Sequence, residues 1–330
     1  MKKYGVAFVG FRHGHIFSLY HKVRQDPRFE IRAVCEENVT ESLLAAHPEI
    51  AVTDTNFDAM LAHTECDIVA VGDYYAKRGS LAIRALRAGR HVIADKPLCT
   101  SLEELDEIER LADRRDLKVG CMFELRSSPA AAAAREAILG GKLGKITQIQ
   151  FTGQHPLMRN ARPKWYFEPG KHGGTISDIA VHCIDLIPYL TGLEIDRTVA
   201  ARTWQAFDSG CSCFDDAAQF MLTLTNGCGV LADVSYAAPD TFGYTHPAYW
   251  RFTVWGTKGM IEFNCGGDGV KAWLDGRSEV ARLAPPAAPP EDYLAAFLHD
   301  LAGEPTALDT KRVLLSTRRT LEIQQIADRG

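Results

Sequence analysis

In the first third of the chain, short apolar runs alternate with segments in which apolar residues recur every three to four positions. The runs predict five strands, at residues 4–9, 30–35, 67–71, 90–94 and 117–123. One intervening segment places Ile16, Leu19, Tyr20 and Val23 on a single helical face. Strands that alternate with helices are typical of a parallel sheet covered by helices.

Two local signals support the helix boundaries in this region. Ser101 followed by Glu104 forms a capping box at the start of one predicted helix. Gly89 is expected to end the helix before the fourth strand, because glycine tolerates the left-handed conformation found at helix ends.

The pattern changes after residue 125. One helix is predicted over Pro129–Leu139, and the following strands succeed one another without intervening helices, which indicates an antiparallel half. Asn226-Gly227 predicts a type I′ hairpin turn, and residues 256–259 predict a second hairpin. We therefore expect two domains, at residues 1–124 and 125–330.

Length and composition fit this division. The chain has 330 residues, long for one core, and a formal net charge of −5 from 37 basic and 42 acidic residues. Without a basic block, a nucleic-acid partner is not expected. Nine cysteines without a C-x-x-C pair indicate reduced thiols and a cytoplasmic location. No segment approaches the roughly 18 apolar residues of a membrane span, so no membrane association is expected.

The first strand leads into the loop Gly10-Phe11-Arg12-His13-Gly14-His15, an incomplete match to the dinucleotide-binding G-x-G-x-x-G. Gly10 can make the tight turn and Gly14 allows close helix packing. Arg12 replaces the second glycine, and its guanidinium can pair with a phosphate oxygen. The alternative is a strand-to-helix turn that binds nothing.

Glu36 ends the second strand, 26 residues after Gly10, near the ~20-residue offset of the acidic residue that receives ribose hydroxyls. This position favours NAD over NADP, because a 2′-phosphate would face a carboxylate with no adjacent arginine. The alternative is that Glu36 simply begins a solvated loop.

Lys96 follows the apolar run that predicts the fourth strand, and Pro97 ends the strand. The carboxyl ends of parallel strands form the crevice where ligands bind, and a partly desolvated lysine there can polarise a reacting oxygen. A structural lysine that extends its charge to solvent is the alternative.

Asp178, His182 and Asp185 occur at i, i+4 and i+7 and form one polar stripe on an apolar helix. They suit acid/base chemistry, or they are a satisfied core histidine and a capping aspartate. Metal binding is a further alternative, with nearby candidate ligands His155, His172 and Cys183. No third ligand has the spacing of known helical zinc motifs, so we expect no metal.

Taken in order, these segments resemble the Gfo/Idh/MocA oxidoreductases. ALRAGRHV at residues 85–92 and the following Asp95-Lys96-Pro97 are similar to the family's A-L-x-x-G-x-H-V and E-K-P segments. Gly173-Gly174 with the Asp178 stripe is similar to its G-G…D-x-x-x-H-x-x-D segment. Asp95 replaces the usual glutamate, and Tyr74, Tyr75 and Arg78 stand where the family has Pro, Asn and His.

The resemblance implies an α/β protein with an N-terminal Rossmann-type, doubly wound parallel sheet and a C-terminal α+β domain with a large, mostly antiparallel sheet. The open face of that sheet is expected to form a homodimer or homotetramer. It also implies an enzyme that transfers a hydride between a nicotinamide cofactor and a hydroxyl-bearing carbon of a sugar, cyclitol or related molecule. The alternatives are a non-catalytic nucleotide- or sugar-binding regulator and a nicotinamide-assisted lyase or glycosidase.

The resemblance also assigns roles to residues. Lys96 is expected to contact the substrate oxygen and the nicotinamide, His182 to act as acid/base, and Asp178 to lie beside it in the substrate pocket. Arg126 and Asp185 are further candidates for substrate contact. The residues expected to bind the cofactor are Gly10, Phe11, Arg12, Gly14, Glu36, Asp73 and Lys96.

Overall fold

The computed structural model describes residues 3–207, 210–267 and 269–329, which pack into two compact units. The first unit contains the chain up to Met122 together with Pro163–Gly173 and Ala296–Thr317. The second contains Phe123–Arg162, Gly174–Ala295 and the chain from Arg318 onward. The domain division at residue 124 stays a prediction, and two later segments of the chain pack within the first unit.

The first unit is built on a five-stranded parallel sheet in the order β2-β1-β3-β4-β5. In sequence order its strands are β1 Tyr4–Val9, β2 Phe29–Cys35, β3 Ile68–Val71, β4 His91–Ala94 and β5 Val119–Cys121. All five predicted strands are present. The chain moves from β1 to β2 on one side and then to β3 on the other, so the crevice for ligands lies between the ends of β1 and β3.

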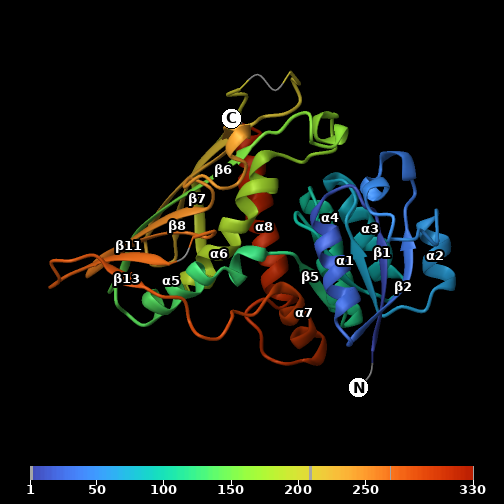
Figure 1. The fold of residues 1–330 in the computed structure, drawn as a ribbon, viewed down its shortest axis with the longest axis horizontal. Helices are drawn as coiled ribbons and strands as arrows, with labels where there is room; N and C mark the ends of the chain where they lie inside the picture. The colour runs from blue at the N-terminus through green and yellow to red at the C-terminus, as the bar shows by residue number, and fades with distance from the viewer. Residues whose placement is uncertain (1–2, 208–209, 268, 330) are drawn as a thin grey trace. The chain divides into compact units, whose positions relative to one another are not determined.

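The helices of this unit confirm the predicted pattern (Figure 1). They are α1 His15–Gln25, α2 Phe57–His63, α3 Tyr75–Arg87 and α4 Leu102–Arg115. The predicted apolar face of α1 is buried. The Ser101 hydroxyl accepts the Glu104 N–H at 3.1 Å at the start of α4, and Gly89 has φ +77° after α3.

The second unit is built on an eight-stranded sheet in the order β13-β12-β11-β10-β6-β9-β8-β7. Its strands are β6 Ile146–Pro156, β7 Ile195–Trp204, β8 Ala217–Leu224, β9 Gly229–Ala238, β10 Arg251–Gly256, β11 Gly259–Asn264, β12 Val270–Leu274 and β13 Ala281–Leu283. The β6–β9 pair is parallel and the other pairs are antiparallel, which confirms a mostly antiparallel sheet.

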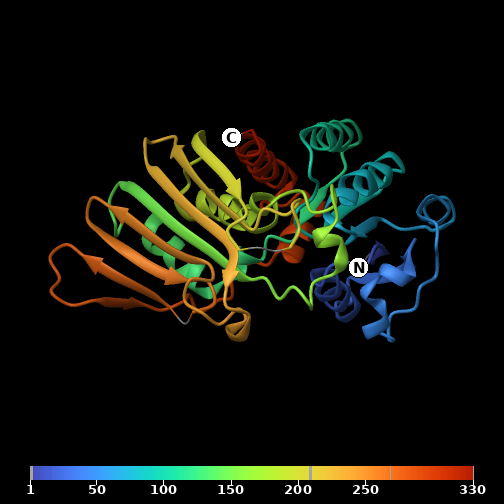
Figure 2. The same cartoon turned by 90° about the horizontal axis from the view of Figure 1, so that it is seen from above.

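Helices α5 Pro129–Leu139 and α6 Val181–Thr191 lie against one face of this sheet (Figure 2). The chain ends with α7 Tyr293–Ala302 and α8 Thr310–Ala327. No helix in the described part of the chain is long and apolar enough to cross a membrane.

Both predicted hairpins are present, but the turn type predicted at Asn226-Gly227 is wrong. A type I′ turn needs positive φ at both residues, whereas only Gly227 has one, at +86°. The Gly227 N–H donates to the Leu224 carbonyl and the Leu224 N–H to the Cys228 carbonyl. The strand register therefore leaves a longer loop in which glycine supplies the left-handed position.

Candidate functional site

Arg78 connects the ends of two neighbouring strands in the first unit. Its guanidinium is fully buried on α3 and donates to the Asp73 carbonyl at 2.7 Å and to the Asp95 carboxylate at 2.8 Å. It also donates to the carbonyls of Lys96 and Pro97. The sequence argument placed Arg78 in the family's His position but gave it no role. Its four acceptors come from the loops after β3 and β4, so it fixes both loops.

A chain of hydrogen bonds extends from Asp95 into the same unit. Asp95 is fully buried and contacts His13 Nδ1 at 2.6 Å and His15 Nδ1 at 3.1 Å. The Tyr75 hydroxyl lies 3.2 Å from His13 Nε2 and 2.6 Å from the Tyr166 hydroxyl. Nothing in the sequence pattern brings these residues together, because Tyr166 comes from a segment that returns to this unit.

The protonation states of these residues determine which atom donates each hydrogen bond. Burial, partly offset by Asp95, lowers the pKa of His13 from 6.5 to about 3, so His13 is neutral at pH 7. Although Asp95 is buried, the charge of Arg78 and the hydrogen bond from His13 hold the pKa of its carboxyl well below the ordinary value. His13 Nδ1–H therefore donates to Asp95, and Nε2 accepts the Tyr75 proton. Tyr75 oxygen then accepts from Tyr166.

Lys96 lies at the carboxyl end of β4, as predicted, and is only 4% exposed. Its Nζ is 6.0 Å from the centre of the Tyr75 ring. A lysine that merely extended its charge into solvent would not be buried to this degree. The structure thus holds a cation in partly dry surroundings beside the Tyr75–His13 chain.

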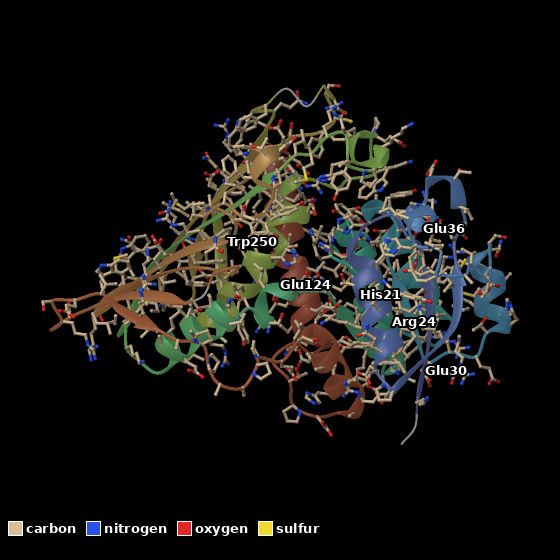
Figure 3. The ribbon with its side chains drawn as sticks, viewed as in Figure 1. His21, Arg24, Glu30, Glu36, Glu124 and Trp250 are labelled. Atoms are coloured by element: carbon tan, nitrogen blue, oxygen red, sulfur yellow. The ribbon has the colours of Figure 1, made fainter. Side chains whose placement is uncertain are left out.

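Glu36 and Arg12 form a buried ion pair next to the glycine loop (Figure 3 labels Glu36). Glu36 accepts the Phe11 N–H at 2.8 Å, the Asn38 N–H at 3.1 Å and Arg12 Nη2 at 3.3 Å. The sequence argument that no arginine adjoins Glu36 is therefore wrong, because Arg12 folds back across the loop. Arg12 also pairs with Glu41 at 2.7 Å and with Asp73 at 3.4 Å, so three carboxylates surround one guanidinium.

The residues around the β1 turn fit a dinucleotide. Gly10 has φ +75°, and a Cβ there would lie 2.6 Å from Asp73, so the tight turn requires glycine. A Cβ on Gly14 would meet nothing within 4 Å, so the close helix packing predicted for this glycine is wrong, and the start of α1 has open space. The N–H groups of a first helical turn suit a pyrophosphate. Glu36 uses three of about four acceptor positions, and its longest contact, to Arg12, is the one a ribose hydroxyl can replace.

In the second unit, Asp178 lies in a single π-helical turn, Ile176–Ala180, that precedes α6. Gln324 of α8 caps this turn, since its Oε1 accepts the N–H groups of Ile176 at 3.0 Å and Ser177 at 3.2 Å. A Cβ on Gly174 would lie 2.3 Å from the Gln324 side chain, which explains the glycine. The sequence predicted a regular helix here and missed the π turn, because its cap comes from a residue 148 positions away.

The Tyr236 hydroxyl donates to Asp178, and the Tyr236 ring packs on Phe214 with centroids 5.1 Å apart. His182 lies on the first turn of α6 and is 5% exposed. Its ring packs edge-to-face with Trp250, with centroids 5.4 Å apart (Figure 3 labels Trp250). Asp178 and His182 are thus both buried on one continuous helical segment. Sequence reasoning did not find Tyr236, which lies on β9 without a distinguishing motif.

Arg126 and Asp185, the two predicted substrate contacts, lie together. Arg126 Nε and Nη2 donate to the two carboxylate oxygens of Asp185 at 2.6 and 2.7 Å, and both side chains are at most 6% exposed. In this bidentate geometry the Arg126 guanidinium and the Asp185 carboxylate hydrogen-bond to each other through two parallel bonds. Their contact with a substrate stays a prediction.

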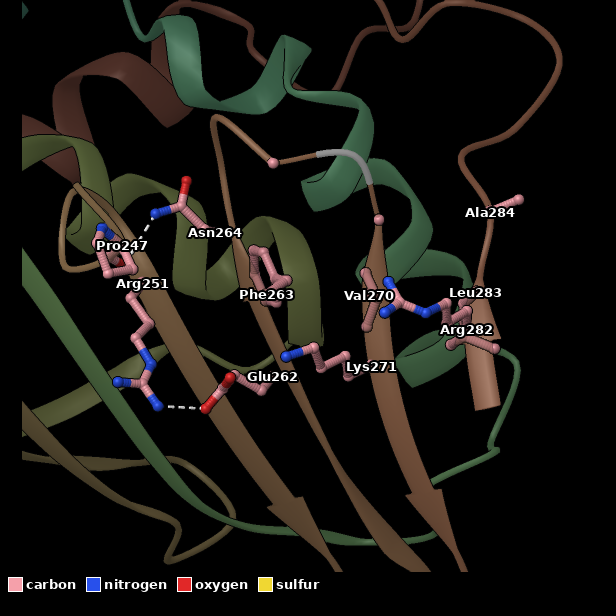
Figure 4. Close-up of a pocket in the computed structure, with 12 residues that line it drawn as sticks. Pro247, Arg251, Glu262, Phe263, Asn264, Val270, Lys271, Arg282, Leu283 and Ala284 are labelled. Atoms are coloured by element: carbon pink, nitrogen blue, oxygen red, sulfur yellow. Dashed lines mark hydrogen bonds and ion pairs between the residues drawn. The ribbon is translucent and has the colours of Figure 1, made fainter. Parts of the chain in front are cut away.

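Two groups in the described part of the chain bring three possible metal ligands together. They are His13–His15–Asp95 and His21–His47–Glu49, and neither includes Asp178 or His182. A groove of about 500 Å³ lies along β10–β13 and contains the Arg251–Glu262 ion pair (Figure 4). None of the predicted site residues lines it.

We predict that the protein loses stability as the pH is lowered from 6.5 towards 3, because of His13. The unfolded chain takes up a proton near pH 6.5, whereas native His13 takes it up only near pH 3, so acid favours unfolding across this interval. The free energy of unfolding should fall by about 1.4 kcal/mol per pH unit below pH 6. Asp95, whose native pKa is lowered, adds to this loss only below about pH 4.

Urea unfolding between pH 4 and 7 measures this slope. His13→Gln should flatten it, whereas His63→Gln, at a histidine whose side chain is 61% exposed, should not. Equal slopes in the wild type and His13→Gln would contradict a neutral buried His13.

We predict that Arg126→Met destabilises the fold by about 3–5 kcal/mol, because it leaves the Asp185 carboxylate buried without its guanidinium. The double variant Arg126→Met/Asp185→Leu should recover part of this loss. Urea unfolding gives both values. If the single variant keeps its stability and only KM rises, the pair contacts substrate instead of supporting α6.

Comparison with known proteins places both units in one family. Residues 4–123 match the model of an oxidoreductase family with an NAD-binding Rossmann fold, and residues 131–262 match the GFO/IDH/MocA C-terminal domain. The chain is 25% identical to levoglucosan dehydrogenase of Pseudarthrobacter phenanthrenivorans over 68% of this chain and 65% of that protein. It is 26% identical to inositol 2-dehydrogenase of Rhizobium meliloti over 62% of this chain and 59% of that protein.

The matched region spans about half to two thirds of the length of such relatives. A solved inositol dehydrogenase homolog from Azotobacter vinelandii, in complex with NAD+, has the same fold, with a TM-score of 0.79, 18% identity and coverage of 100% of this chain and 96% of that one. The two family models agree with the observed parallel Rossmann sheet and the eight-stranded sheet. The chain therefore belongs to the Gfo/Idh/MocA oxidoreductase family, with an NAD-binding Rossmann unit.

Proposed function

We propose that the protein is an NAD-dependent dehydrogenase that transfers a hydride between the nicotinamide and a hydroxyl-bearing carbon of a sugar or cyclitol. The observation that carries this proposal is Lys96, a buried cation at the carboxyl end of β4 in an NAD-binding Rossmann unit. The names of relatives that act on levoglucosan and inositol support a polyhydroxylated substrate.

Lys96 stabilises the oxygen that becomes negative as the hydroxyl loses its proton. A fixed positive charge is most effective in partly dry surroundings, where water does not screen it and no reorganisation is needed. Arg78 holds the Lys96 carbonyl and the adjacent Asp95 carboxylate, so the lysine backbone cannot drift. When bound, the nicotinamide supplies the two-electron acceptor for the hydride.

His182 takes the hydroxyl proton in the oxidation direction and returns it in the reduction direction. Histidine is the side chain whose ordinary pKa is nearest to neutrality, which suits both directions. Asp178 lies one helical turn earlier, and its hydrogen bond from Tyr236 fixes the carboxylate. In this proposal the carboxylate orients His182 or accepts a second substrate hydroxyl.

Three carboxylates around Arg12 favour NAD over NADP. A 2′-phosphate at Glu36 would meet the carboxylates of Glu36, Glu41 and Asp73, balanced by Arg12 and by Lys77, which is itself shared with Glu37. NAD instead offers ribose hydroxyls, which donate hydrogen bonds to a carboxylate.

We predict that Lys96→Met lowers kcat at least about 100-fold while NAD still binds, because the lost charge acts mainly on the reacting oxygen. Turnover is followed by nicotinamide absorbance with a panel of sugars and cyclitols. Binding is followed by thermal stabilisation, since a ligand of the native state raises the Tm. NAD should raise the Tm of wild type and variant alike, and NADP should raise it less.

Lys118→Met is the matched control, because the Lys118 ammonium pairs with the exposed Asp116 carboxylate at 3.3 Å and lies at the other end of the sheet, before β5. Undiminished turnover in Lys96→Met would remove Lys96 from the chemistry. If NAD stabilises the wild type but no polyol is turned over, a non-catalytic regulator replaces the dehydrogenase proposal.

We further propose that two copies of the chain associate through the open face of the eight-stranded sheet. Met221 and Leu231 are cross-strand neighbours on this face and are 42% and 51% exposed. Val199 and Trp273 are also exposed large apolar residues on strands of this sheet. Exposed apolar side chains such as the adjacent Met221 and Leu231 on a sheet face are typical of protein contact surfaces.

We predict that Met221→Glu/Leu231→Glu separates the assembly, because two carboxylates would be buried at its centre. Light scattering coupled to size-exclusion chromatography measures the mass. Phe242→Glu, at a 62% exposed site outside the strands, is the control. A wild type that is monomeric at micromolar concentration would refute the proposal.

A further inference from the structure

His21, His47 and Glu49 converge on one point at the surface of the first unit. His21 lies on α1 (Figure 3), and the other two residues lie in the segment that follows β2. His47 Nδ1 is 3.2 Å and His21 Nε2 is 3.6 Å from the same oxygen, Glu49 Oε1. Two imidazoles and one carboxylate are a common ligand set for transition metal ions.

The separations of these atoms match the edges of a tetrahedral site. Zinc binds imidazole nitrogen and carboxylate oxygen at about 2.0–2.1 Å, so two of its ligands lie about 3.3 Å apart. The two measured separations, 3.2 and 3.6 Å, bracket this value. All three ligand atoms lie within 4.8 Å of one another, and the side chains are 32–41% exposed, so a fourth position is open to water.

The three ligands are held by different parts of the fold. The His47 ring stacks on Phe17 of α1, with centroids 3.8 Å apart and an angle of 17° between the planes. His47 and Glu49 belong to a turn closed by a hydrogen bond from the Ile50 N–H to the His47 carbonyl, with Pro48 between them. Proline restricts the φ angle, which limits the freedom of the turn. His21 lies one helical turn after Phe17, on the same face of α1.

The buried group His13–His15–Asp95 has different geometry. His13 Nδ1 and Asp95 lie 2.6 Å apart, shorter than the roughly 3.3 Å between two zinc ligands and typical of a shared proton. Arg78 also pairs with Asp95 at 2.8 Å, so a fixed positive charge already compensates this carboxylate. This group is a hydrogen-bond network, and the geometry therefore singles out the surface group.

We propose that His21, His47 and Glu49 bind a divalent transition metal ion of the Zn²⁺ type, with water as the fourth ligand. The ion replaces the two imidazole protons that face Glu49 and joins α1 to the segment after β2. That segment also contacts the glycine loop, since the Leu43 N–H donates to the Phe11 carbonyl at 2.8 Å. The metal thus fastens the segment that supports this loop, independently of the proposed dehydrogenase activity.

Zinc chloride added to protein stripped of metal with a chelator tests the proposal. We expect one zinc ion per chain, measured by competition with a chromophoric chelator, and a higher Tm. Amide exchange of residues 43–50 should slow in its presence. His21→Ala and Glu49→Gln should each weaken zinc binding by about 100-fold or more, because each removes a ligand, whereas changes to supporting residues alone typically cost 10–100-fold.

Two histidine variants serve as controls. His63→Ala removes an exposed histidine that pairs with Asp54, and His15→Ala removes a member of the buried group. Both should keep the zinc affinity of the wild type. Circular dichroism of the metal-free variants checks folding, and the partial exposure of His21 and Glu49 predicts little change. The proposal is overturned if His21→Ala and Glu49→Gln bind zinc like the wild type, or if only His15→Ala loses it.

Discussion

The organisation of the first unit depends on one buried cation. Arg78 is fully buried and its guanidinium donates to four acceptors from two separate loops. A buried guanidinium without such partners would be strongly destabilising, so the loops after β3 and β4 are constrained to stay where they satisfy it. Lys96 occupies its position because its neighbours along the chain are held by Arg78.

The same constraint explains the protonation of the neighbouring residues. Arg78 keeps Asp95 ionised, and the ionised carboxylate accepts a hydrogen bond from His13 Nδ1–H. Neutral His13 then orients Tyr75, and Tyr75 meets Tyr166 from a distant segment. The charge of Arg78 thereby orders the hydrogen bonds of four other residues, and substitution of any of them would disturb the rest.

In the second unit, the surroundings of Asp178 come from two other elements of the fold. Asp178 is held by a tyrosine hydroxyl from β9, and the turn that carries it is capped by Gln324 of α8. Asp185, which forms a buried ion pair with Arg126, lies two helical turns further along, on α6. The hydrogen bond from the Tyr236 hydroxyl orients the Asp178 carboxylate, which suits a residue proposed to orient an imidazole or a substrate hydroxyl.

Much of the fold could be predicted from the sequence because its signals are local. Apolar periodicity located the five parallel strands, the face of α1 and the change to an antiparallel half. Gly10 and Lys96 follow the ends of β1 and β4, as predicted. The hairpin at Asn226-Gly227 was also found, but its turn type follows from cross-strand register, which a dipeptide does not specify.

What only the tertiary structure decided involves partners that are distant in sequence. Three sets of contacts join residues that are between 24 and 91 positions apart in sequence. They are the Arg12–Glu36 ion pair, the Arg126–Asp185 ion pair and the hydrogen bonds that connect Asp95 with Tyr166. A side chain's pattern along the chain reports whether it is buried, but its hydrogen-bond partner depends on which elements pack together. The sequence by itself therefore determined the strands, the helices and the candidate cations and acids, and the packing determined which charges neutralise one another.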